Sequence, residues 1–421
     1  MAALELFPDT ATVEDGELAV GGVRVSRLAA DFGTPLVVYC ERTLRERARA
    51  YRRAAPDATI LYGSKAFPSV ALLRLLAEEG LGADVSTLGE LEFALRAGVA
   101  PSAVVVHGNN KSDEELAAAA AADAWLVVLD ALGEVERAAA AGVRRVLVRV
   151  TPGIDPDTHD AIKTGHHGSK FGLPPEQALE ALAAARDRLE PLGVHVHLGS
   201  QLLDVTPARL LVDWLAGFAA ECRSELGWTP EIVDLGGGLG IPYVEDEPAP
   251  SIHDFVGTIV ERLERAWALH DLPRPRLVLE PGRSLVGPAG FTLYRVGVVK
   301  RASETTTYVA VDGGMSDNPR PQLYDARYTA LLANRADEPP ASGYTVCGKH
   351  CESGDVMIER VALPVPRRGD LLAVPATGAY ALGMSSNYNA VPRPAAVLVR
   401  DGEARLIRRR ETIDDLLSLE A

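Results

Sequence analysis

The stretch Ala58-Thr59-Ile60-Leu61-Tyr62-Gly63-Ser64-Lys65-Ala66 joins an apolar run to a lysine, and Phe67-Pro68-Ser69 then opens a helical pattern. A short apolar run bounded by turn signals is typical of a buried strand. Lys65 therefore follows the strand at the point where the chain leaves the core. There its ammonium can be partly desolvated, which favours the neutral amine and frees its lone pair for imine chemistry. Taken alone, Lys65 is more simply an exposed loop lysine, so the rest of the chain must decide.

Outward from this stretch, apolar strand patterns alternate strictly with helical patterns. Strands are expected at 58–64, 82–86, 103–107, 125–129, 145–151, 194–199, 231–235 and 276–280. Helices are expected at about 68–79, 88–98, 112–122, 132–141, 174–189, 205–226 and 252–270. Strands that are each separated by a helix indicate a parallel sheet, and eight such units match a closed (β/α)8 TIM barrel. We assign residues 34–287 to this barrel, with one long insertion, Pro152 to Gly172, after its fifth strand.

A second domain is expected outside the barrel, because the alternation stops after about residue 288. The remaining strand patterns have turn signals such as Asp401-Gly402, which favours a hairpin. Asp15-Gly16 and Gly21-Gly22 mark similar hairpins near the N-terminus. We therefore expect residues 1–33 and 288–421 to form one mostly antiparallel β domain, which makes the whole chain α/β in class.

Composition excludes several classes of function. The 421 residues carry a net charge of −15, which argues against a nucleic-acid partner. No apolar run approaches the roughly 18–20 residues that span a bilayer, and Met1 to Phe7 lacks the pattern of a secretory signal, so a cytoplasmic protein is expected. Four cysteines make no disulfide framework. Cys347, His350 and Cys351 supply only three clustered ligands, so no metal site is expected.

Polar and glycine residues mark nearly every expected strand exit. In barrels of this kind, chemistry collects at the C-terminal ends of the strands. The residues at these exits are Lys65, Asp84, His107-Gly108-Asn109-Asn110, His197, Ser200, Gly236-Gly237-Gly238, Glu280, Gly282 and Arg283. One ring of functional groups around one barrel mouth is the simplest explanation.

The chemistry of these exits points to one cofactor. Gly236 to Gly238 can close backbone N–H groups on an anion, and the loops after strands seven and eight are where barrels usually hold a phosphate. His197, with Ser200 nearby, can stack on a flat ring. Glu280 ends an apolar strand, where a carboxylate needs a cation, either Arg283 or a protonated ring nitrogen. With Lys65, these groups are what pyridoxal 5'-phosphate requires.

Over essentially its whole length, the chain resembles the fold-type III pyridoxal-phosphate decarboxylases, whose barrel is shared by alanine racemase and ornithine decarboxylase. The motifs that carry the resemblance are Tyr62-Gly63-Ser64-Lys65-Ala66, Gly82-Ala83-Asp84-Val85-Ser86, His107-Gly108-Asn109-Asn110-Lys111, His195-Val196-His197-Leu198-Gly199-Ser200-Gln201, Asp234-Leu235-Gly236-Gly237-Gly238, Glu280-Pro281-Gly282-Arg283, Met315-Ser316-Asp317-Asn318-Pro319-Arg320, Cys351-Glu352-Ser353-Gly354-Asp355 and Thr377-Gly378-Ala379-Tyr380. Ser64 stands where many members carry alanine. The ordered set is far more specific than any one motif.

The resemblance implies a role for each matching residue. Lys65 would form the Schiff base, His197 would stack on the pyridine ring, and Glu280 would pair with the ring nitrogen. The other residues expected to bind the cofactor are Asp84, Ser200, Gly236, Gly237, Gly238, Gly282, Arg283 and Tyr380. Cys351 would be the proton donor and Glu352 a substrate ligand. In the family these two act across a subunit interface, which implies a homodimer with shared active sites.

The expected reaction follows from the charge at the ring nitrogen. Loss of CO2 leaves electrons at Cα, which a protonated ring delocalises as a quinonoid. An arginine at that nitrogen, as in racemases of this fold, makes a poorer electron sink, so Glu280 favours decarboxylation.

The distal end of the substrate decides which amino acid is used. Arginines can grip a distal carboxylate, and the residues expected there are Arg283, Arg320, Tyr324, Glu352 and Tyr380. The resemblance thus implies decarboxylation of meso-2,6-diaminopimelate to L-lysine and CO2, the last step of lysine biosynthesis.

Three alternatives stay open at this point. A decarboxylase of the same fold could act on another amino acid in a specialised pathway. A non-catalytic pyridoxal-phosphate carrier would lack the β domain and its Cys-Glu-Ser-Gly-Asp segment, both of which are expected here. A catalytically dead, partner-binding relative would be expected to have lost Lys65 or Cys351, and both are present.

Overall fold

The computed structural model describes residues 2–152 and 169–421, which form two compact units. The barrel unit comprises residues 47–240 and 249–282, and the β unit comprises residues 1–46, 241–248 and 283–421. Most of the expected insertion from Pro152 to Gly172 lies outside the described residues.

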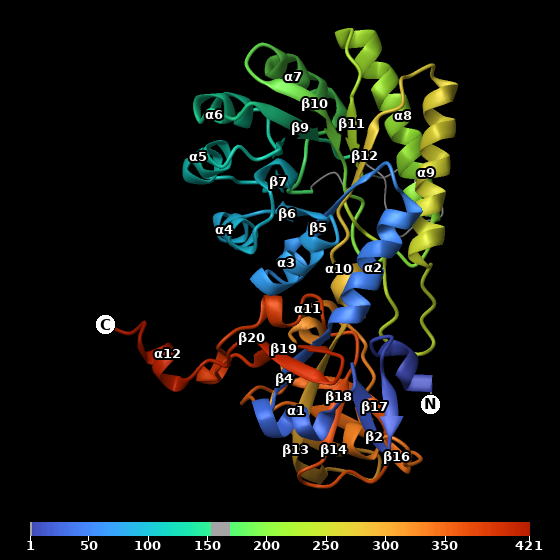
Figure 1. Ribbon diagram of the computed structural model, residues 1–421, viewed down its shortest axis with the longest axis vertical. Helices are drawn as coiled ribbons and strands as arrows, with labels where there is room; N and C mark the ends of the chain where they lie inside the picture. Colours follow the sequence, from blue (N-terminus) through green and yellow to red (C-terminus); the bar gives the residue numbers. More distant parts are fainter. Residues whose placement is uncertain (1, 153–168) are drawn as a thin grey trace. The chain divides into compact units, whose positions relative to one another are not determined.

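The barrel unit contains a closed ring of eight parallel strands with helices between them (Figure 1). The strands are β5 (Thr59–Gly63), β6 (Gly82–Val85), β7 (Val104–Val106), β8 (Leu126–Leu129), β9 (Arg145–Arg149), β10 (Glu190–His195), β11 (Ile232–Asp234) and β12 (Arg276–Leu279). The ring closes because β12 pairs with β5, through Val278 with Thr59 and Leu279 with Ile60. The predicted (β/α)8 barrel is confirmed, although β10 runs from Glu190 to His195 and so begins and ends four residues before the expected 194–199.

Helices follow the first seven strands of the barrel in chain order. They are α3 (Val70–Glu78), α4 (Leu88–Ala97), α5 (Asp113–Ala121), α6 (Glu134–Ala140), α7 (Pro175–Arg186), α8 (Thr206–Leu226) and α9 (Ile252–Leu269). The Thr87 and Ser251 side chains accept hydrogen bonds from backbone N–H groups in the first turns of α4 and α9. Ser112 and Glu115 form a capping box at α5. Such caps satisfy backbone donors that have no partner inside the helix.

The barrel interior is apolar, which explains why the strands read as continuous hydrophobic runs. Leu61, Val105, Leu126, Leu147 and Val278 pack there in one buried cluster. Each comes from a different strand, so the cluster ties the ring together and leaves the polar strand exits outside the core.

The β unit contains a nine-stranded mixed sheet and a separate three-stranded sheet. The larger sheet is built from β4 (Leu36–Cys40), β13 (Gly290–Arg301), β14 (Thr307–Val311), β15 (Leu331–Leu332), β16 (Ser342–Cys347), β17 (Val356–Leu363), β18 (Leu371–Val374), β19 (Ala395–Arg400) and β20 (Glu403–Arg408). Most of its pairs are antiparallel, but β4 with β19 and β14 with β16 are parallel. The smaller sheet consists of β1 (Thr12–Glu14), β2 (Glu17–Val20) and β3 (Val23–Arg24).

The first long strand of the chain belongs to the β unit, although the sequence pattern had placed it at the start of the barrel domain. β4 pairs with β13 and β19, and its side chains are all buried. The pairing partners lie more than 250 residues away in sequence, so no local pattern identifies them. The domain limits of 34–287 that the sequence indicates stay a prediction. In the structure, the first boundary between the two compact units lies after Glu46.

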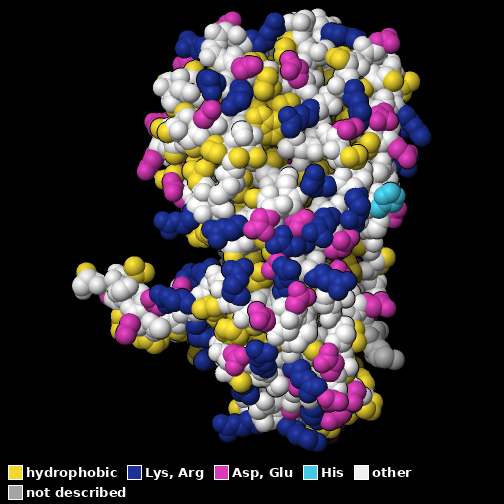
Figure 2. Space-filling model, in the orientation of Figure 1, with side chains coloured by type: hydrophobic (Ala, Val, Ile, Leu, Met, Phe, Trp, Pro, Cys, Tyr) yellow, Lys and Arg dark blue, Asp and Glu magenta, His cyan; other side chains and the backbone are white. Residues whose placement is uncertain are grey.

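Short helices complete the chain, several of which the sequence pattern did not predict. They are α1 (Val25–Phe32), α2 (Glu41–Ala54), α10 (Arg283–Val286), α11 (Arg320–Tyr324) and α12 (Ile413–Leu417). The basic amphipathic pattern from Glu41 to Ala55 predicts α2, whereas the others are one or two turns long and lack a sustained apolar period. Within the described residues, no helix is long and apolar enough to cross a membrane. Basic and acidic side chains are interspersed on the visible surface (Figure 2).

Candidate functional site

Lys65 lies just after β5 and forms an ion pair with the strand exit beside it. Its Nζ is 2.7 Å from Oδ2 of Asp84 on β6, and the Asp84 side chain is only 1% exposed. The hydroxyl of Ser64 donates to the backbone carbonyl of Asp84 at 2.7 Å, which fixes the two exits against each other. The Lys65 side chain itself keeps 46% of its surface exposed. The Lys65 ammonium is therefore less desolvated than expected. Its position is set by the ion pair with the buried Asp84 carboxylate.

Glu280 follows β12 and is buried among two histidines. Its Oε1 lies 2.6 Å from Nε2 of His107, which follows β7, and its Oε2 lies 3.5 Å from Nε2 of His195 on β10. The two imidazole rings meet edge to face, with centroids 4.8 Å apart. Nε2 of His107 is also 3.7 Å from Oδ1 of Asp84, so His107 stands between two carboxylates of the barrel mouth.

These contacts shift the pKa values of the buried carboxyl groups and of His195. Burial alone would raise the pKa of Glu280, but His107 and His195 hold that pKa well below the ordinary value. Burial, together with the charge on Glu280, raises the pKa of Asp234 well above its ordinary value. Burial lowers the pKa of His195 to about 3. At neutral pH, Glu280 is therefore the ionised carboxylate and His195 a neutral imidazole, while the surroundings of Asp234 favour its protonated form.

The same four side chains have the composition of a metal site. Ligand atoms of His107, His195, Asp234 and Glu280 all lie within 4.8 Å of one another. A metal would require deprotonated ligands, whereas burial raises the pKa of Asp234 and a hydrogen bond already joins His107 to Glu280. We therefore interpret the group as a proton-sharing cluster. The expectation that Cys347, His350 and Cys351 hold no metal stays a prediction; His350 Nδ1 lies 2.7 Å from Asp355 Oδ2.

The glycine loop after β11 closes tightly on its neighbours. Gly236 has φ of +62°, and a Cβ there would lie 2.5 Å from Nδ1 of His197. A Cβ on Gly237 would lie 2.5 Å from the carbonyl oxygen of Glu280. Only glycine therefore allows this loop to approach both His197 and the β12 exit. The backbone N–H groups of such a loop can face an anion, and the expected phosphate site here stays a prediction.

His197 lies half-buried at the exit of β10, where Leu198 and Gly199 lead to the exposed Ser200. Burial and the charge of Lys65 lower the pKa of His197 to about 3. A neutral imidazole carries no cationic penalty against an electron-poor ring, which suits the stacking role expected for it. Gly282, the last residue of the barrel unit, directly precedes Arg283 in the chain.

The β unit gathers two of the predicted arginines around tyrosine rings. Arg283 donates from Nη1 to the hydroxyl of Tyr243, and its guanidinium lies 4.8 Å from the ring centroid of Tyr380. The guanidinium of Arg320 lies over the ring of Tyr243, 4.2 Å from its centroid. It also donates from Nη1 to the hydroxyl of Tyr328 at 2.5 Å.

Arg320 is a buried cation that has no acidic partner among the residues that the structure describes. Its exposed fraction is 6%, and across residues 2–152 and 169–421 no carboxylate lies within ion-pair distance of it. Tyrosine faces stabilise a guanidinium but do not neutralise it. Arg320, which lies against the rings of Tyr243 and Tyr328, is thus suited to bind an anionic group of a ligand.

Tyr324, Cys351 and Glu352 differ from this group because they are exposed. Tyr324 at the end of α11 is 63% exposed, and Cys351 and Glu352 are also exposed. The backbone N–H of Cys351 donates to Oδ1 of Asn389 at 2.9 Å. Next to it, the buried Asp355 accepts from the backbone N–H of His350 at 2.9 Å. The segment is therefore well anchored, while its thiol and carboxylate face outward.

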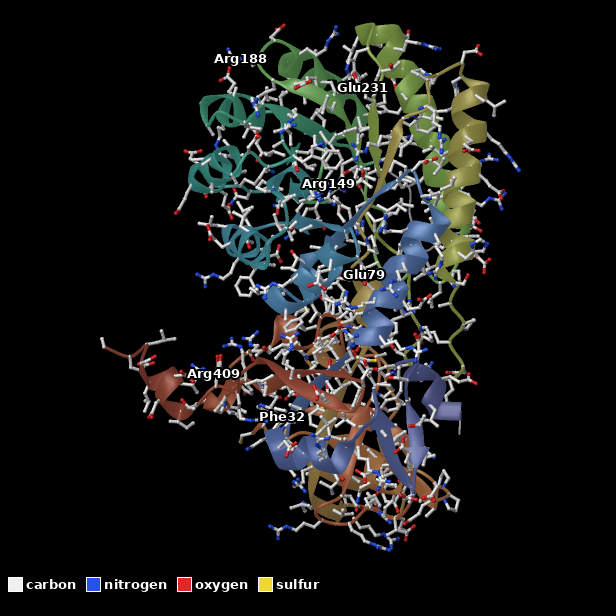
Figure 3. The ribbon with its side chains drawn as sticks, viewed as in Figure 1. Phe32, Glu79, Arg149, Arg188, Glu231 and Arg409 are labelled. Carbon is white, nitrogen blue, oxygen red and sulfur yellow. The ribbon has the colours of Figure 1, made fainter. Side chains whose placement is uncertain are left out.

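Some residues of the site were not identified from the sequence. His107 was placed at a strand exit but was given no role of its own. Asp234 ends β11 in the same way. Arg149, labelled in Figure 3, ends β9 and lies 3.5 Å from Asp130. Nothing in the sequence indicated that Tyr243 and Tyr328 belong to the site, because their role depends on contacts with arginines that only the folded chain shows.

Comparisons with known proteins agree with this arrangement. The family model described as "Pyridoxal-dependent decarboxylase, pyridoxal binding domain" matches residues 41–287. The chain is 46% identical to a diaminopimelate decarboxylase of Actinosynnema pretiosum subsp. auranticum, covering 99% of this chain and 95% of that one. It is 41% identical to a diaminopimelate decarboxylase of Bacillus subtilis, covering 97% and 96%. The crystal structure of diaminopimelate decarboxylase from M. jannaschii in complex with L-lysine superposes with a TM-score of 0.92 at 34% identity, covering 98% of each chain.

Proposed function

Because this chain belongs to the diaminopimelate decarboxylases within the pyridoxal-dependent decarboxylase family, we propose that it removes one carboxylate of meso-2,6-diaminopimelate as CO2 and leaves L-lysine. The observation that carries the proposal is the barrel mouth itself. An ion-paired lysine, a buried ionised glutamate and a tight glycine loop follow neighbouring strands there.

The residues of the barrel mouth fit pyridoxal 5'-phosphate. Asp84 Oδ1 and Asp234 Oδ2 are buried and lack hydrogen-bond partners among the described residues, so the cluster has capacity for a further polar ligand. The loop where a phosphate is expected packs so closely on the β12 exit that a Cβ on Gly237 would lie 2.5 Å from the carbonyl oxygen of Glu280. Lys65 lies beside these groups with its side chain accessible. We propose that Lys65, Asp84, His197, Ser200, Gly236 to Gly238, Glu280, Gly282, Arg283 and Tyr380 hold the cofactor.

In the reaction, the bound pyridoxal ring supplies the acceptor for the electrons that remain on Cα when CO2 departs. The ionised Glu280 would hold a proton at the ring nitrogen, which is the state that accepts electrons best. Asp84 orients Lys65 through the 2.7 Å ion pair, and the neutral imidazole of His197 would provide a stacking face for the ring. The thiol of Cys351 returns a proton to Cα, which acid catalysis requires at that step.

The substrate is selected by its distal end, which carries both a carboxylate and an ammonium. Arg320 supports this choice because it is a buried cation without an acidic partner among the described residues. We propose that Arg320, Arg283, Tyr324 and Tyr380 bind the distal carboxylate and that Glu352 binds the distal ammonium. Ornithine or lysine presents only an amine there, so a buried arginine would repel it.

A homodimer with shared active sites is part of the proposal, as is a cytoplasmic location. Cys351, Glu352 and Tyr324 have proposed contacts with the substrate but are exposed in the single chain. Exposed apolar side chains also gather near the C-terminus, where Ile413, Leu417 and Leu419 are 54%, 59% and 86% exposed (Figure 2). A second copy of the chain would cover such groups.

The proposal is tested by measuring CO2 release from the purified protein with added pyridoxal phosphate. Meso-diaminopimelate, L-lysine, L-ornithine and L-arginine are compared, and the product is identified by chromatography. We expect lysine from meso-diaminopimelate and no release from the other three. Release from L-ornithine or L-lysine instead would overturn the assignment of the distal pocket while leaving the cofactor assignment intact.

A further inference from the structure

His107 joins the two carboxylates on which the barrel site depends. Its Nε2 lies 2.6 Å from Oε1 of Glu280 and 3.7 Å from Oδ1 of Asp84. Asp84 in turn binds Lys65 through its other oxygen at 2.7 Å. The imidazole is 7% exposed, so little water competes for these contacts. His107 is therefore placed to act on the residue that pairs with the ring nitrogen and beside the residue that holds the lysine.

The neighbouring polar groups make longer contacts with Glu280 than His107 does, or are engaged with other partners. His195 on β10 lies 3.5 Å away, and both of its ring nitrogens lack hydrogen-bond partners within the described chain. Asp234 on β11 is a buried acid whose Oδ1 accepts from the backbone N–H of Gly236 at 2.9 Å. Arg149 on β9 is paired with Asp130 at 3.5 Å. In the described part of the chain, His107 is the side chain that hydrogen bonds to Glu280.

We propose that His107 is a positioning residue that donates from Nε2 to Oε1 of Glu280, keeps this carboxylate ionised, and leaves Oε2 for the cationic ring nitrogen of the cofactor. The inference rests on the proposed function and deepens it. A buried carboxylate without a donor or a positive charge beside it takes up a proton. A protonated Glu280 would no longer hold a proton at the ring nitrogen, and the cofactor would lose the electron-accepting state that decarboxylation needs.

The test compares His107→Leu with His107→Gln in the full-length chain. Leucine removes the donor while keeping the site filled, whereas the amide nitrogen of glutamine can reach the position of Nε2 and restore a neutral donor. His253→Leu, at an exposed position in the first turn of α9, is the matched control. Two readouts need no substrate: the dissociation constant for pyridoxal phosphate, and the absorption spectrum of the bound cofactor across the pH range.

For His107→Leu we expect cofactor affinity to fall about 10- to 100-fold, the range of a lost hydrogen bond to a charged group. The absorption spectrum of the cofactor bound to this variant should also change with pH, over a range in which the spectrum of the unmodified protein stays constant. His107→Gln should recover most of the affinity, and His253→Leu should match the unmodified protein. In steady-state assays, His107→Leu should lower kcat with little change in KM.

A folded His107→Leu protein with unchanged cofactor affinity and an unchanged spectrum would overturn the inference. If the leucine variant does not fold, His107→Asn replaces it, since asparagine is polar but too short to reach Oε1, and the same expectations hold. Failure of the proposed function is distinguishable, because it would appear as absent lysine formation by the unmodified protein, whatever the spectra of the variants.

Discussion

The guanidinium of Arg320 lies 4.2 Å from the ring centroid of Tyr243, and the hydroxyl of the same tyrosine accepts a hydrogen bond from Arg283. One aromatic side chain thus organises two arginines. The ring face stabilises one cation and the phenol oxygen orients the other. This arrangement can present two positive groups to one distal carboxylate without an internal acid competing for Arg320.

Replacement of Arg320 by alanine should raise KM for diaminopimelate about 100-fold or more and change kcat less. The reason is that a bidentate, charge-assisted contact is lost, and each such hydrogen bond contributes about 1.5–3 kcal/mol. Steady-state kinetics with chromatographic detection of lysine measures both constants. Arg368→Ala, which removes an exposed arginine of the same unit, should leave both unchanged. A KM within a few-fold of normal would contradict the proposed role of Arg320.

Substitutions at Tyr243 should separate its two contributions. Tyr243→Phe keeps the ring beneath Arg320 but removes the acceptor for Arg283, so we expect a KM increase of roughly 3- to 10-fold, equivalent to one ordinary hydrogen bond. Tyr243→Ala removes both and should cost considerably more. Equal KM values for the two variants would show that the ring face contributes nothing.

Replacement of Gly237 by alanine should weaken cofactor binding, because its Cβ would lie 2.5 Å from the carbonyl oxygen of Glu280. Backbone must shift to accommodate the methyl group, at about 1–3 kcal/mol, which corresponds to roughly 5- to 150-fold in affinity. Fluorescence titration with pyridoxal phosphate measures the loss. Gly257→Ala on α9 is the control, since its Cβ meets no atom within 4 Å. Equal affinities for the two variants would be evidence against a phosphate at this loop.

Removal of the Cys351 thiol should slow lysine formation far more than it affects cofactor binding. A positioned acid typically increases the rate of such a proton transfer about 10²- to 10⁴-fold. We expect Cys351→Ala to lose activity on that scale while the absorption spectrum of the bound cofactor is retained. Cys222→Ala, at a buried position in the barrel unit, controls for general effects of removing a thiol. An unchanged rate for Cys351→Ala would refute the assignment.

Mixing two inactive variants tests whether active sites are shared between subunits. Lys65→Ala removes the lysine, and Cys351→Ala removes the proton donor. If the two groups act on one substrate from different chains, dissociation and reassociation of an equal mixture should restore about a quarter of normal activity, because half the dimers are mixed and each holds one intact site. No recovery in a confirmed mixed dimer would mean that both groups act within one chain.

The stability of the β unit should depend on pH through Asp317. Burial raises the pKa of Asp317 to about 6, although Tyr294 donates a hydrogen bond to its Oδ2 at 2.6 Å. The folded chain therefore binds this proton more tightly than the unfolded chain does. Its stabilising contribution is fully present below about pH 4 and is lost as the pH rises through 6.

Asp317→Asn should accordingly gain stability relative to the unmodified protein between pH 4.5 and 7. We expect a relative gain of about 1–3 kcal/mol over this range. Thermal unfolding at a series of pH values measures it. Asp31→Asn, which neutralises an exposed carboxylate of the same unit, accounts for the change in net charge. Parallel pH profiles for the Asp317→Asn and unmodified proteins would contradict the prediction.

The barrel could be predicted almost strand by strand because its signals are local. The strands are short apolar runs, helical patterns separate them, and polar residues follow most of the runs directly. Lys65, Asp84, His197 and Glu280 could be placed at one mouth because parallel strands bring all their C-terminal ends to the same side. The β unit was less predictable, since β4 pairs with β13 and β19, whose positions no local pattern indicates.

By itself, the sequence determined the alternation of strands and helices, the residues at the strand exits, and through its motifs the cofactor and the reaction. Only the tertiary structure decided the pairings within the sites: His107 with Glu280, Asp84 with Lys65, and Tyr243 with Arg283 and Arg320. Secondary structure depends on the neighbours of a residue along the chain. Charge states and ligand geometry depend on its neighbours in space, which folding brings together from distant segments.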